Sequence, residues 1–234
     1  MTGGPVVELV KAGVTYSADS GPVRALTEVS CSFEAGTSTA VIGRSGAGKS
    51  TLVSVLALMR SPTSGAVLVN GRPVPTAERA RAQLRASTVG MIFQSFHLDP
   101  ATTAAQNVLL PWHFNPRVGR REAQAHAAEI FERLGIAELM NRPVGAMSGG
   151  QRQRVAIARA MVARPRVLLA DEPTGNLDEE TGLAVAEDLY ALKHSGTAVI
   201  VVSHDAVVAA MAERVLRLAH GRLAAAAHEP DGVP

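Results

Sequence analysis

The chain lacks the features that mark secreted and membrane-spanning proteins. It has one cysteine in 234 residues, so no disulfide can form within it, and this suits a reducing compartment. Its longest apolar runs, such as TAVIVV, fall far short of the roughly 20 residues that a membrane helix needs. The N-terminal MTGGPVVELV predicts no signal peptide. We therefore expect a cytoplasmic protein that reaches the inner face of the cell membrane only through a partner.

Aromatic residues and net charge are also scarce. Aromatics make up 3% of the chain, and the formal net charge is only +2. A balance this close to neutral predicts no nucleic-acid surface. Hydrophobic residues reach 47%, which is ordinary for a globular protein with a buried core. The length fits one large domain or one domain with an inserted lobe.

Three short runs of branched apolar residues predict buried strands, since each ends in a polar or glycine turn. They are STAVIG, RVLLAD and TAVIVVSH, at residues 38–43, 166–171 and 197–204. Helical patterns lie between them, so we expect an α/β fold with a mainly parallel sheet. Ligands bind such sheets at the carboxyl ends of the strands. Polar side chains stand at two of these ends: Asp171, Glu172 and His204.

Two further parts are predicted around this core. VVELVKAGVTY, VSCSF and AVLVNGRPV are short runs joined by glycine turns, and they predict a small N-terminal antiparallel sheet. From about residue 98 the pattern becomes helical. In REAQAHAAEIFERLGI, one helical face carries Ala123, Ala127, Ile130, Phe131 and Leu134. We expect one domain over residues 1–234, with a core of residues 1–97 and 164–234 and an inserted helical subdomain of residues 98–163. The tail from Leu223 predicts no stable element.

GRSGAGKST, at residues 43–51, matches the phosphate-binding pattern G-x-x-x-x-G-K-[ST]. It follows a predicted strand and precedes a helical pattern, and this context disfavours the alternative of a plain glycine-rich turn. Backbone N–H groups of such a loop curl around phosphate oxygens at a helix N-terminus. Lys49 would reach the β- and γ-phosphates of ATP, and Ser50 would place its hydroxyl on Mg²⁺. The expected nucleotide-binding residues here are Gly43, Arg44, Ser45, Gly46, Ala47, Gly48, Lys49, Ser50 and Thr51.

VLLADEPTGNLD, at residues 167–178, runs from an apolar strand directly into two acids. A phosphate-binding loop needs an acid at a second strand for the metal ion, and a group that orients water. Asp171 fits the first role, and Glu172 is the candidate general base. The alternative is a helix N-cap region with solvated acids.

MSGGQRQRVAIARAMV, at residues 147–162, predicts a second phosphate-type site. Ser148, Gly149 and Gly150 precede a helical pattern, so a hydroxyl and bare backbone would stand at a helix N-terminus. One chain with two such sites but a single phosphate-binding loop suggests that two chains share their nucleotides. The alternative is an ordinary capped helix with a basic face.

The loop, SGGQ, LLADEP, GNLD and SHD occur in the order seen in ABC-type ATPase domains, and the chain resembles that family over nearly its whole length. The resemblance implies an ATPase that uses ATP and Mg²⁺, pairs head to tail as a homodimer and powers a separate transmembrane permease. The ATP of one copy would face Ser148–Gln151 of the other.

The resemblance also implies roles that the residues alone do not. Tyr16 would stack on adenine, and Gln94 would touch Mg²⁺ and water. Asp178 would signal across the dimer, and His204 would contact the γ-phosphate. Taken alone, Tyr16 and Gln94 are simply polar residues at strand ends. The catalytic residues would then be Lys49, Gln94, Glu172 and His204, and the metal ligands Ser50, Gln94 and Asp171.

A narrower resemblance rests on DEPTGNLD, GMIFQSFHL and NVLLPW, which are similar to the ATPases of lipoprotein-release and macrolide-export systems and their cell-division relative. Met147 stands where leucine is usual, and Asp99 stands where an apolar residue is common. The output could be export or force transmission. The alternative is regulation of a membrane partner that acts on cell-wall enzymes without any cargo. A soluble ABC ATPase of ribosomes or DNA fits this chain length poorly.

Overall fold

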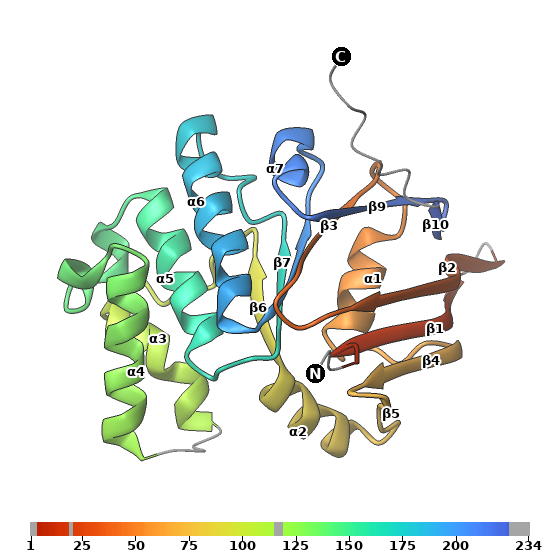
Figure 1. The fold of residues 1–234 in the computed structure, drawn as a ribbon, viewed down its shortest axis with the longest axis horizontal. Helices are drawn as coiled ribbons and strands as arrows, with labels where there is room; N and C mark the ends of the chain where they lie inside the picture. The colour runs from red at the N-terminus through yellow and green to blue at the C-terminus, as the bar shows by residue number, and fades with distance from the viewer. Residues whose placement is uncertain (1–3, 19–20, 115–118, 225–234) are drawn as a thin grey trace.

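The computed structural model describes residues 4–18, 21–114 and 119–224, which form two sheets and a set of helices (Figure 1). The helices α3 to α5 lie on one side of the larger sheet, and the smaller sheet lies on the other. In the described part of the chain, no helix is long and apolar enough to cross a membrane.

The larger sheet has six strands in the order β10-β9-β3-β8-β7-β6. All neighbouring pairs are parallel except β9 and β10, so the expectation of a mainly parallel sheet is confirmed. Its strands are β3 (Ser38–Ile42), β6 (Val89–Phe93), β7 (Val167–Asp171), β8 (Ala198–Val202), β9 (Arg214–Ala219) and β10 (Arg222–Ala224).

The smaller sheet is antiparallel throughout, in the order β2-β1-β4-β5, as the glycine-punctuated N-terminal runs predict. Its strands are β1 (Val7–Ala18), β2 (Gly21–Phe33), β4 (Ser64–Val69) and β5 (Arg72–Pro73).

The helices connect and cover these strands. The α-helices are α1 (Lys49–Leu56), α2 (Glu78–Thr88), α3 (Ala104–Phe114), α4 (Arg120–Arg133), α5 (Gly149–Met161), α6 (Glu179–Ala191) and α7 (Ala206–Ala210). Three short 3₁₀ turns are η1 (Ala137–Leu139), η2 (Val144–Ala146) and η3 (Leu192–Ser195). The helical pattern expected after residue 98 is present in α3, α4 and α5. The boundaries of the inserted subdomain remain a prediction, because α5 also packs against β6 and α6 of the core.

The strand β7 explains how the core divides. Its residues point alternately to the two faces of the sheet. Val167 and Leu169 join a cluster with α1 and the smaller sheet, whereas Leu168 and Ala170 join a cluster with the helices α4 to α6. All four are fully buried. A strand that is covered on both faces is apolar without alternation, which is why RVLLAD reads as a continuous apolar run.

Three elements differ from the sequence-based expectation. The helix α2 and the strand β9 were not predicted. The tail was wrongly expected to be unstructured from Leu223, because Leu223 and Ala224 pair with Leu218 and Arg217 in an antiparallel hairpin. The remainder of that tail lies outside the described residues. The five apolar residues expected on one helical face, in contrast, are all buried around α4.

Candidate nucleotide site

The glycine-rich loop lies between the end of β3 and the start of α1, pressed against neighbouring backbone. Gly46 and Gly48 have φ angles of 77° and 102°, in the left-handed region that favours glycine. A Cβ atom on Gly48 would overlap the carbonyl oxygen of Ala25, and one on Gly43 would overlap that of Leu218. The two glycines therefore allow the loop to pack directly on β2 and β9.

Lys49 is the first residue of α1, and its ammonium group turns back into the loop. It donates to the carbonyl oxygens of Gly43 at 2.7 Å and Arg44 at 3.4 Å. A cavity of about 400 Å³ lies against the loop, lined by residues 43–47 and 217–220. The concave backbone and its cation have the form of a phosphate cradle.

The turn between β9 and β10 contacts this loop through a backbone hydrogen bond. The N–H of Gly221 donates to the carbonyl of Ala47 at 3.0 Å, and the N–H of Thr27 donates to the carbonyl of Gly221 at 2.8 Å. This contact was not among the predictions from the sequence. The signal was the alternating RVLRLA followed by the turn HG, which is typical of a hairpin strand.

Asp171 ends β7 and lies level with Phe93 of β6 and Val202 of β8. Burial raises the pKa of its carboxyl group, and the nearby charge of Glu172 raises the pKa further, while Lys49 lowers it. Two adjacent carboxyl groups with a restricted water supply favour a bound cation, which would relieve the repulsion between them.

Glu172 and His204 are brought together by the ends of β7 and β8. Glu172 has a φ angle of 48°, and its N–H donates to the carbonyl of Val202 at 2.8 Å. Its Oε2 is 2.8 Å from Nδ1 of His204 and accepts from the His204 N–H at 3.3 Å. The Glu172 side chain is 18% exposed and that of His204 is 71% exposed. An ionised Glu172 would accept a proton from Nδ1 of His204, which would leave Nε2 for another partner.

Gln94 follows β6 directly and contacts the loop after Glu172. Its carbonyl accepts from Nδ2 of Asn176 at 2.9 Å. A Cβ atom on Gly175 would lie 2.9 Å from Nε2 of Gln94, so a larger residue there would displace the end of the Gln94 side chain. The structure thus gathers Gln94, Asp171, Glu172 and His204 at one edge of the sheet, where the parallel strands end.

Ser148–Gln151 form the start of α5 and do not line the cavity at the loop. The Ser148 hydroxyl accepts from the N–H of Gln151 at 3.3 Å, and Oε1 of Gln151 accepts from the N–H of Ser148 at 3.1 Å, which is a capping box. A Cβ atom on Gly150 would overlap the methyl group of Thr181. Gly150 therefore lets α5 pack closely against α6, with Ser148 exposed at its tip.

Asp178 is the N-cap of α6. Its Oδ1 accepts from the N–H of Thr181 at 3.0 Å, and this bond lowers the pKa of the carboxyl group. The residue thus has a capping role whether or not it acts between copies.

Tyr16 contacts the first turn of α1. Its hydroxyl is 3.2 Å from Oγ1 of Thr51, and the guanidinium of Arg60 lies 4.4 Å from the centre of its ring. Arg60 covers one ring face, so a stacked base would use the other. Arg60 was not predicted at this position, because no motif in the sequence marks the residue.

The two departures from the narrower resemblance both have a local explanation. Met147 is buried in the core cluster and replaces one apolar side chain by another. Oδ1 of Asp99 accepts from the N–H of Ala101 at 3.0 Å, and its own N–H donates to Oδ1 of the buried Asn107 at 2.8 Å. Asp99 therefore stabilises a turn.

Three features together define a P-loop nucleoside triphosphatase. They are a glycine-rich loop between a strand and a helix, a lysine whose ammonium group lies in that loop, and a second strand that ends in acids. The family model described as "ABC transporter" matches residues 26–175. The chain therefore belongs to the ABC transporter family, and it is an ATP-binding and ATP-hydrolysing domain of that family.

Individual relatives agree with this assignment. The chain is 42% identical over 224 residues to the lipoprotein-releasing system ATP-binding protein LolD of Bordetella pertussis, covering 94% of this chain and 96% of that protein. It is also 42% identical over 219 residues to the macrolide export ATP-binding/permease protein MacB of Salmonella typhimurium. That match covers 93% of this chain but spans only 34% of the length of MacB.

Solved structures show the same architecture. A dimeric structure of the ATP-binding cassette MJ0796 bound to ADP and phosphate, in a post-hydrolysis state, matches with a TM-score of 0.82 and 33% identity. It covers 93% of this chain and 96% of the MJ0796 chain. The cbiO1 chain of Clostridium perfringens matches with a TM-score of 0.84 and 27% identity, covering 94% and 87% of the two chains. The predicted fold and family are thus confirmed.

Proposed function

We propose that two copies of this chain bind ATP between them, hydrolyse it and drive a separate transmembrane permease from the inner face of the membrane. The observation that carries this proposal is the separation of two phosphate-type sites. The start of α5, with Ser148 exposed, does not line the cavity that residues 43–47 form with residues 217–220. A head-to-tail pair would bring the loop of one copy to the α5 start of the other. The dimeric MJ0796 structures support this arrangement.

Within each site, the loop backbone and Lys49 would hold the phosphates, and Glu172 would accept a proton from the attacking water. As the water oxygen bonds to the γ-phosphorus, the bond from that phosphorus to the β–γ bridging oxygen breaks, giving ADP and phosphate. Nε2 of His204 would face the γ-phosphate because Nδ1 is held by Glu172. A positioned base contributes on the order of 10² to 10⁴ in rate.

The residues present fit Mg²⁺. This ion prefers one or two carboxylates together with substrate phosphates and water, rather than a cage made by the protein. Asp171, with the Ser50 hydroxyl and the Gln94 amide, would supply such a partial set. Bound Mg²⁺ would offset the negative charge of the phosphates during transfer.

The membrane partner is proposed from the relatives. LolD is named as the ATP-binding protein of a lipoprotein-releasing system, and MacB carries ATP-binding and permease parts in one protein. Because the chain matches LolD over nearly its whole length, we propose that it likewise acts as the ATP-binding component of a system whose permease is a separate subunit. The force would pass through the helical lobe of α3, α4 and α5.

Mixed dimers test the shared site. Ser148→Arg adds bulk at the tip of α5, and Lys49→Ala removes the loop cation, so each variant alone should fail to trap ATP between its two copies. A mixed dimer of the two variants retains one intact composite site if the site is shared. Retention of ATP is measured with both chains also carrying Glu172→Gln, which prevents turnover. Equal trapping in mixed and uniform dimers would refute sharing.

A further inference from the structure

A half-buried arginine of α5 holds the loop that follows Gln94. Nη2 of Arg159 donates to the carbonyl oxygen of Phe96 at 2.8 Å, and Nη1 donates to that of His97. Burial lowers the pKa of Arg159, and the ion pairs among the described residues do not include this residue. Its charge is therefore satisfied by loop carbonyls instead of a carboxylate.

The same helix contacts the loop at a second point. The guanidinium of Arg152 lies 5.3 Å from the centre of the Phe96 ring. Arg152 and Arg159 are seven residues apart, so they lie on one face of α5. Phe96 thus meets one arginine through its ring and the other through its carbonyl.

The contacts of α5 with this loop link the two halves of the proposed site, which are the start of α5 and the residues near the candidate base. At its N-terminus, about 16 Å from Arg159 by helical rise, α5 carries Ser148. At the other end of the held segment, the carbonyl of Gln94 accepts from Asn176, which belongs to the loop that begins at Glu172. The segment from Gln94 to His97 is therefore held between α5 and the loop that carries the candidate base.

We propose that Arg159 is a positioning residue for ATP hydrolysis, which fixes the backbone after Gln94 to α5. Seating of the α5 tip against a second copy would then set the place of Gln94 beside the phosphates. The inference rests on the proposed role of Gln94 and on the shared site. It assigns Arg159 no contact with the nucleotide.

Arg154 provides a matched control. It lies on the same helix, its side chain is 27% exposed, and its Nε donates to Oδ2 of Asp188 on α6 at 2.7 Å. Arg154→Met therefore removes a comparable charged hydrogen bond from α5 without touching the loop. A purely structural effect of losing an arginine from α5 should appear equally in Arg154→Met and Arg159→Met.

The experiment measures ATP hydrolysis, ATP affinity and thermal unfolding for the full-length variants. We expect Arg159→Met to lower kcat roughly 10- to 100-fold, because a misplacement of about 1 Å at the reacting groups can cost on the order of 10²-fold in rate. Its ATP affinity should stay within about twofold of the wild type, because Lys49 and Tyr16 are untouched. Arg154→Met should lower the melting temperature at least as much and keep kcat within about twofold. Arg159→Lys, which retains one donor, should recover part of kcat.

Amide hydrogen exchange gives an independent readout. Exchange over residues 95–98 should accelerate in Arg159→Met and stay at the wild-type rate in Arg154→Met. If Arg159→Met does not fold, Arg159→Lys takes its place, and a several-fold loss of kcat with faster exchange is expected. A wild-type kcat in the folded Arg159 variant, or equal losses in the Arg154 and Arg159 variants, overturns the inference.

Gln94→Ala separates the two levels of the argument. If Gln94→Ala loses kcat but Arg159→Met does not, the positioning role of Arg159 fails and the proposed function stands. If Gln94→Ala keeps the wild-type kcat, the role of Gln94 fails, and with it the inference about Arg159.

Discussion

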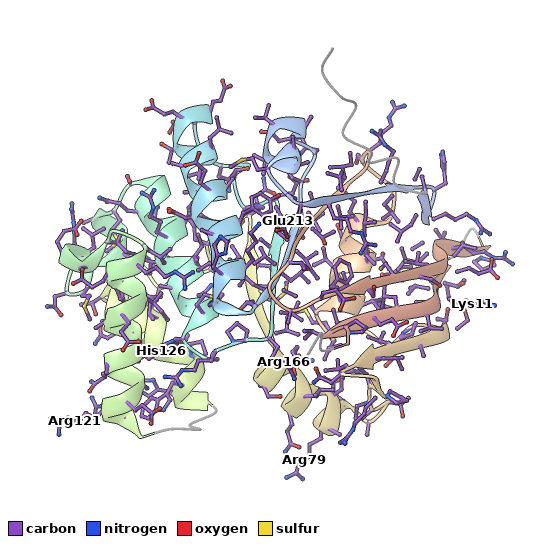
Figure 2. All side chains as sticks on the ribbon, in the orientation of Figure 1. Lys11, Arg79, Arg121, His126, Arg166 and Glu213 are labelled. Carbon is purple, nitrogen blue, oxygen red and sulfur yellow. The ribbon has the colours of Figure 1, made fainter. Side chains whose placement is uncertain are left out.

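The two ends of the larger sheet place their acids under opposite conditions. At the carboxyl ends, burial and a neighbouring Glu172 raise the pKa of Asp171. At the amino ends, Glu213 precedes β9 (Figure 2) and accepts from Nζ of Lys193 at 2.6 Å and from the N–H of Ser38 at 2.9 Å. These hydrogen bonds lower the pKa of Glu213, and the bond from Lys193 has the largest effect. At the carboxyl ends, burial and a like charge disfavour the ionised form of Asp171, whereas at the amino ends, hydrogen bonds from the fold favour the ionised form of Glu213 and fasten it to β3.

This difference teaches how to tell a working acid from a structural one within a single sheet. A carboxylate whose hydrogen bonds are supplied by the fold stabilises the fold. A carboxylate that is buried beside another negative charge, as Asp171 is, instead favours a partner from outside the fold, such as a metal ion. Substitutions at the two ends should therefore separate activity from stability.

The largest effect is expected at the carboxyl ends. Glu172→Gln retains size but cannot accept a proton, so kcat should fall on the order of 10² to 10⁴-fold. The melting temperature should not fall, because the substitution removes one of two repelling charges. Phosphate release and thermal unfolding check the two statements. ATP with Mg²⁺ should also produce a dimer that light scattering detects and that ADP does not support. Turnover at the wild-type rate would remove Glu172 as the base.

The second effect concerns the cation of the loop. Lys49→Ala should weaken ATP binding by roughly 10- to 100-fold, from the about 1.5–3 kcal/mol of a hydrogen bond to a charged group. Equilibrium titration with a fluorescent ATP analogue measures this change. Lys193→Ala, at the amino ends, is the control and should leave ATP affinity unchanged. An unaltered affinity in Lys49→Ala would place the phosphates elsewhere.

A smaller effect is expected at the amino ends. Glu213→Gln keeps a side chain that can accept from Ser38 but loses the ion pair with Lys193. Since the Glu213 side chain is 49% exposed, the loss should be about 1 kcal/mol or less. For a chain of this size the melting temperature should fall by about 2–4 °C at most, with kcat unchanged. A large loss of kcat would contradict the division between the two ends.

The smallest effect is the pH dependence of that contribution. The folded-state pKa of Glu213 is lowered, so its stabilisation is fully present above the unfolded value and is lost as pH falls through the folded one. The stability difference between the wild type and Glu213→Gln should therefore be constant near neutral pH and shrink as pH falls below about 4.3, the usual pKa of a glutamate. Urea unfolding at a series of pH values measures it. A difference that grows on acidification would reverse the sign assigned to Glu213.

Contiguous motifs made much of the fold and of the candidate site predictable. The phosphate loop and the strand ending at Asp171 are written within a few residues each, because their geometry is local. Contacts between segments that are distant in the sequence could not be predicted in this way, because no local motif marks them. Arg159 reaches carbonyls 62 and 63 residues earlier in the chain, and carbonyl acceptors carry no sequence signature. The contact of Arg60 with the Tyr16 ring likewise has no sequence signature. The helix cap at Asp178, in contrast, follows from the ordinary preference for Asp at a helix start.

The support of the phosphate loop by the last hairpin has a consequence for how the chain is made. Residues 43–51 leave the ribosome early, but Gly221, whose N–H holds the carbonyl of Ala47, is synthesised some 170 residues afterwards. At about 5–20 residues per second, that interval lasts roughly ten seconds or more. During that interval, the phosphate loop of the nascent chain lacks its contact with the β9–β10 hairpin. Tight nucleotide binding should therefore arise late, and a growing chain would be kept from engaging ATP before its core is complete.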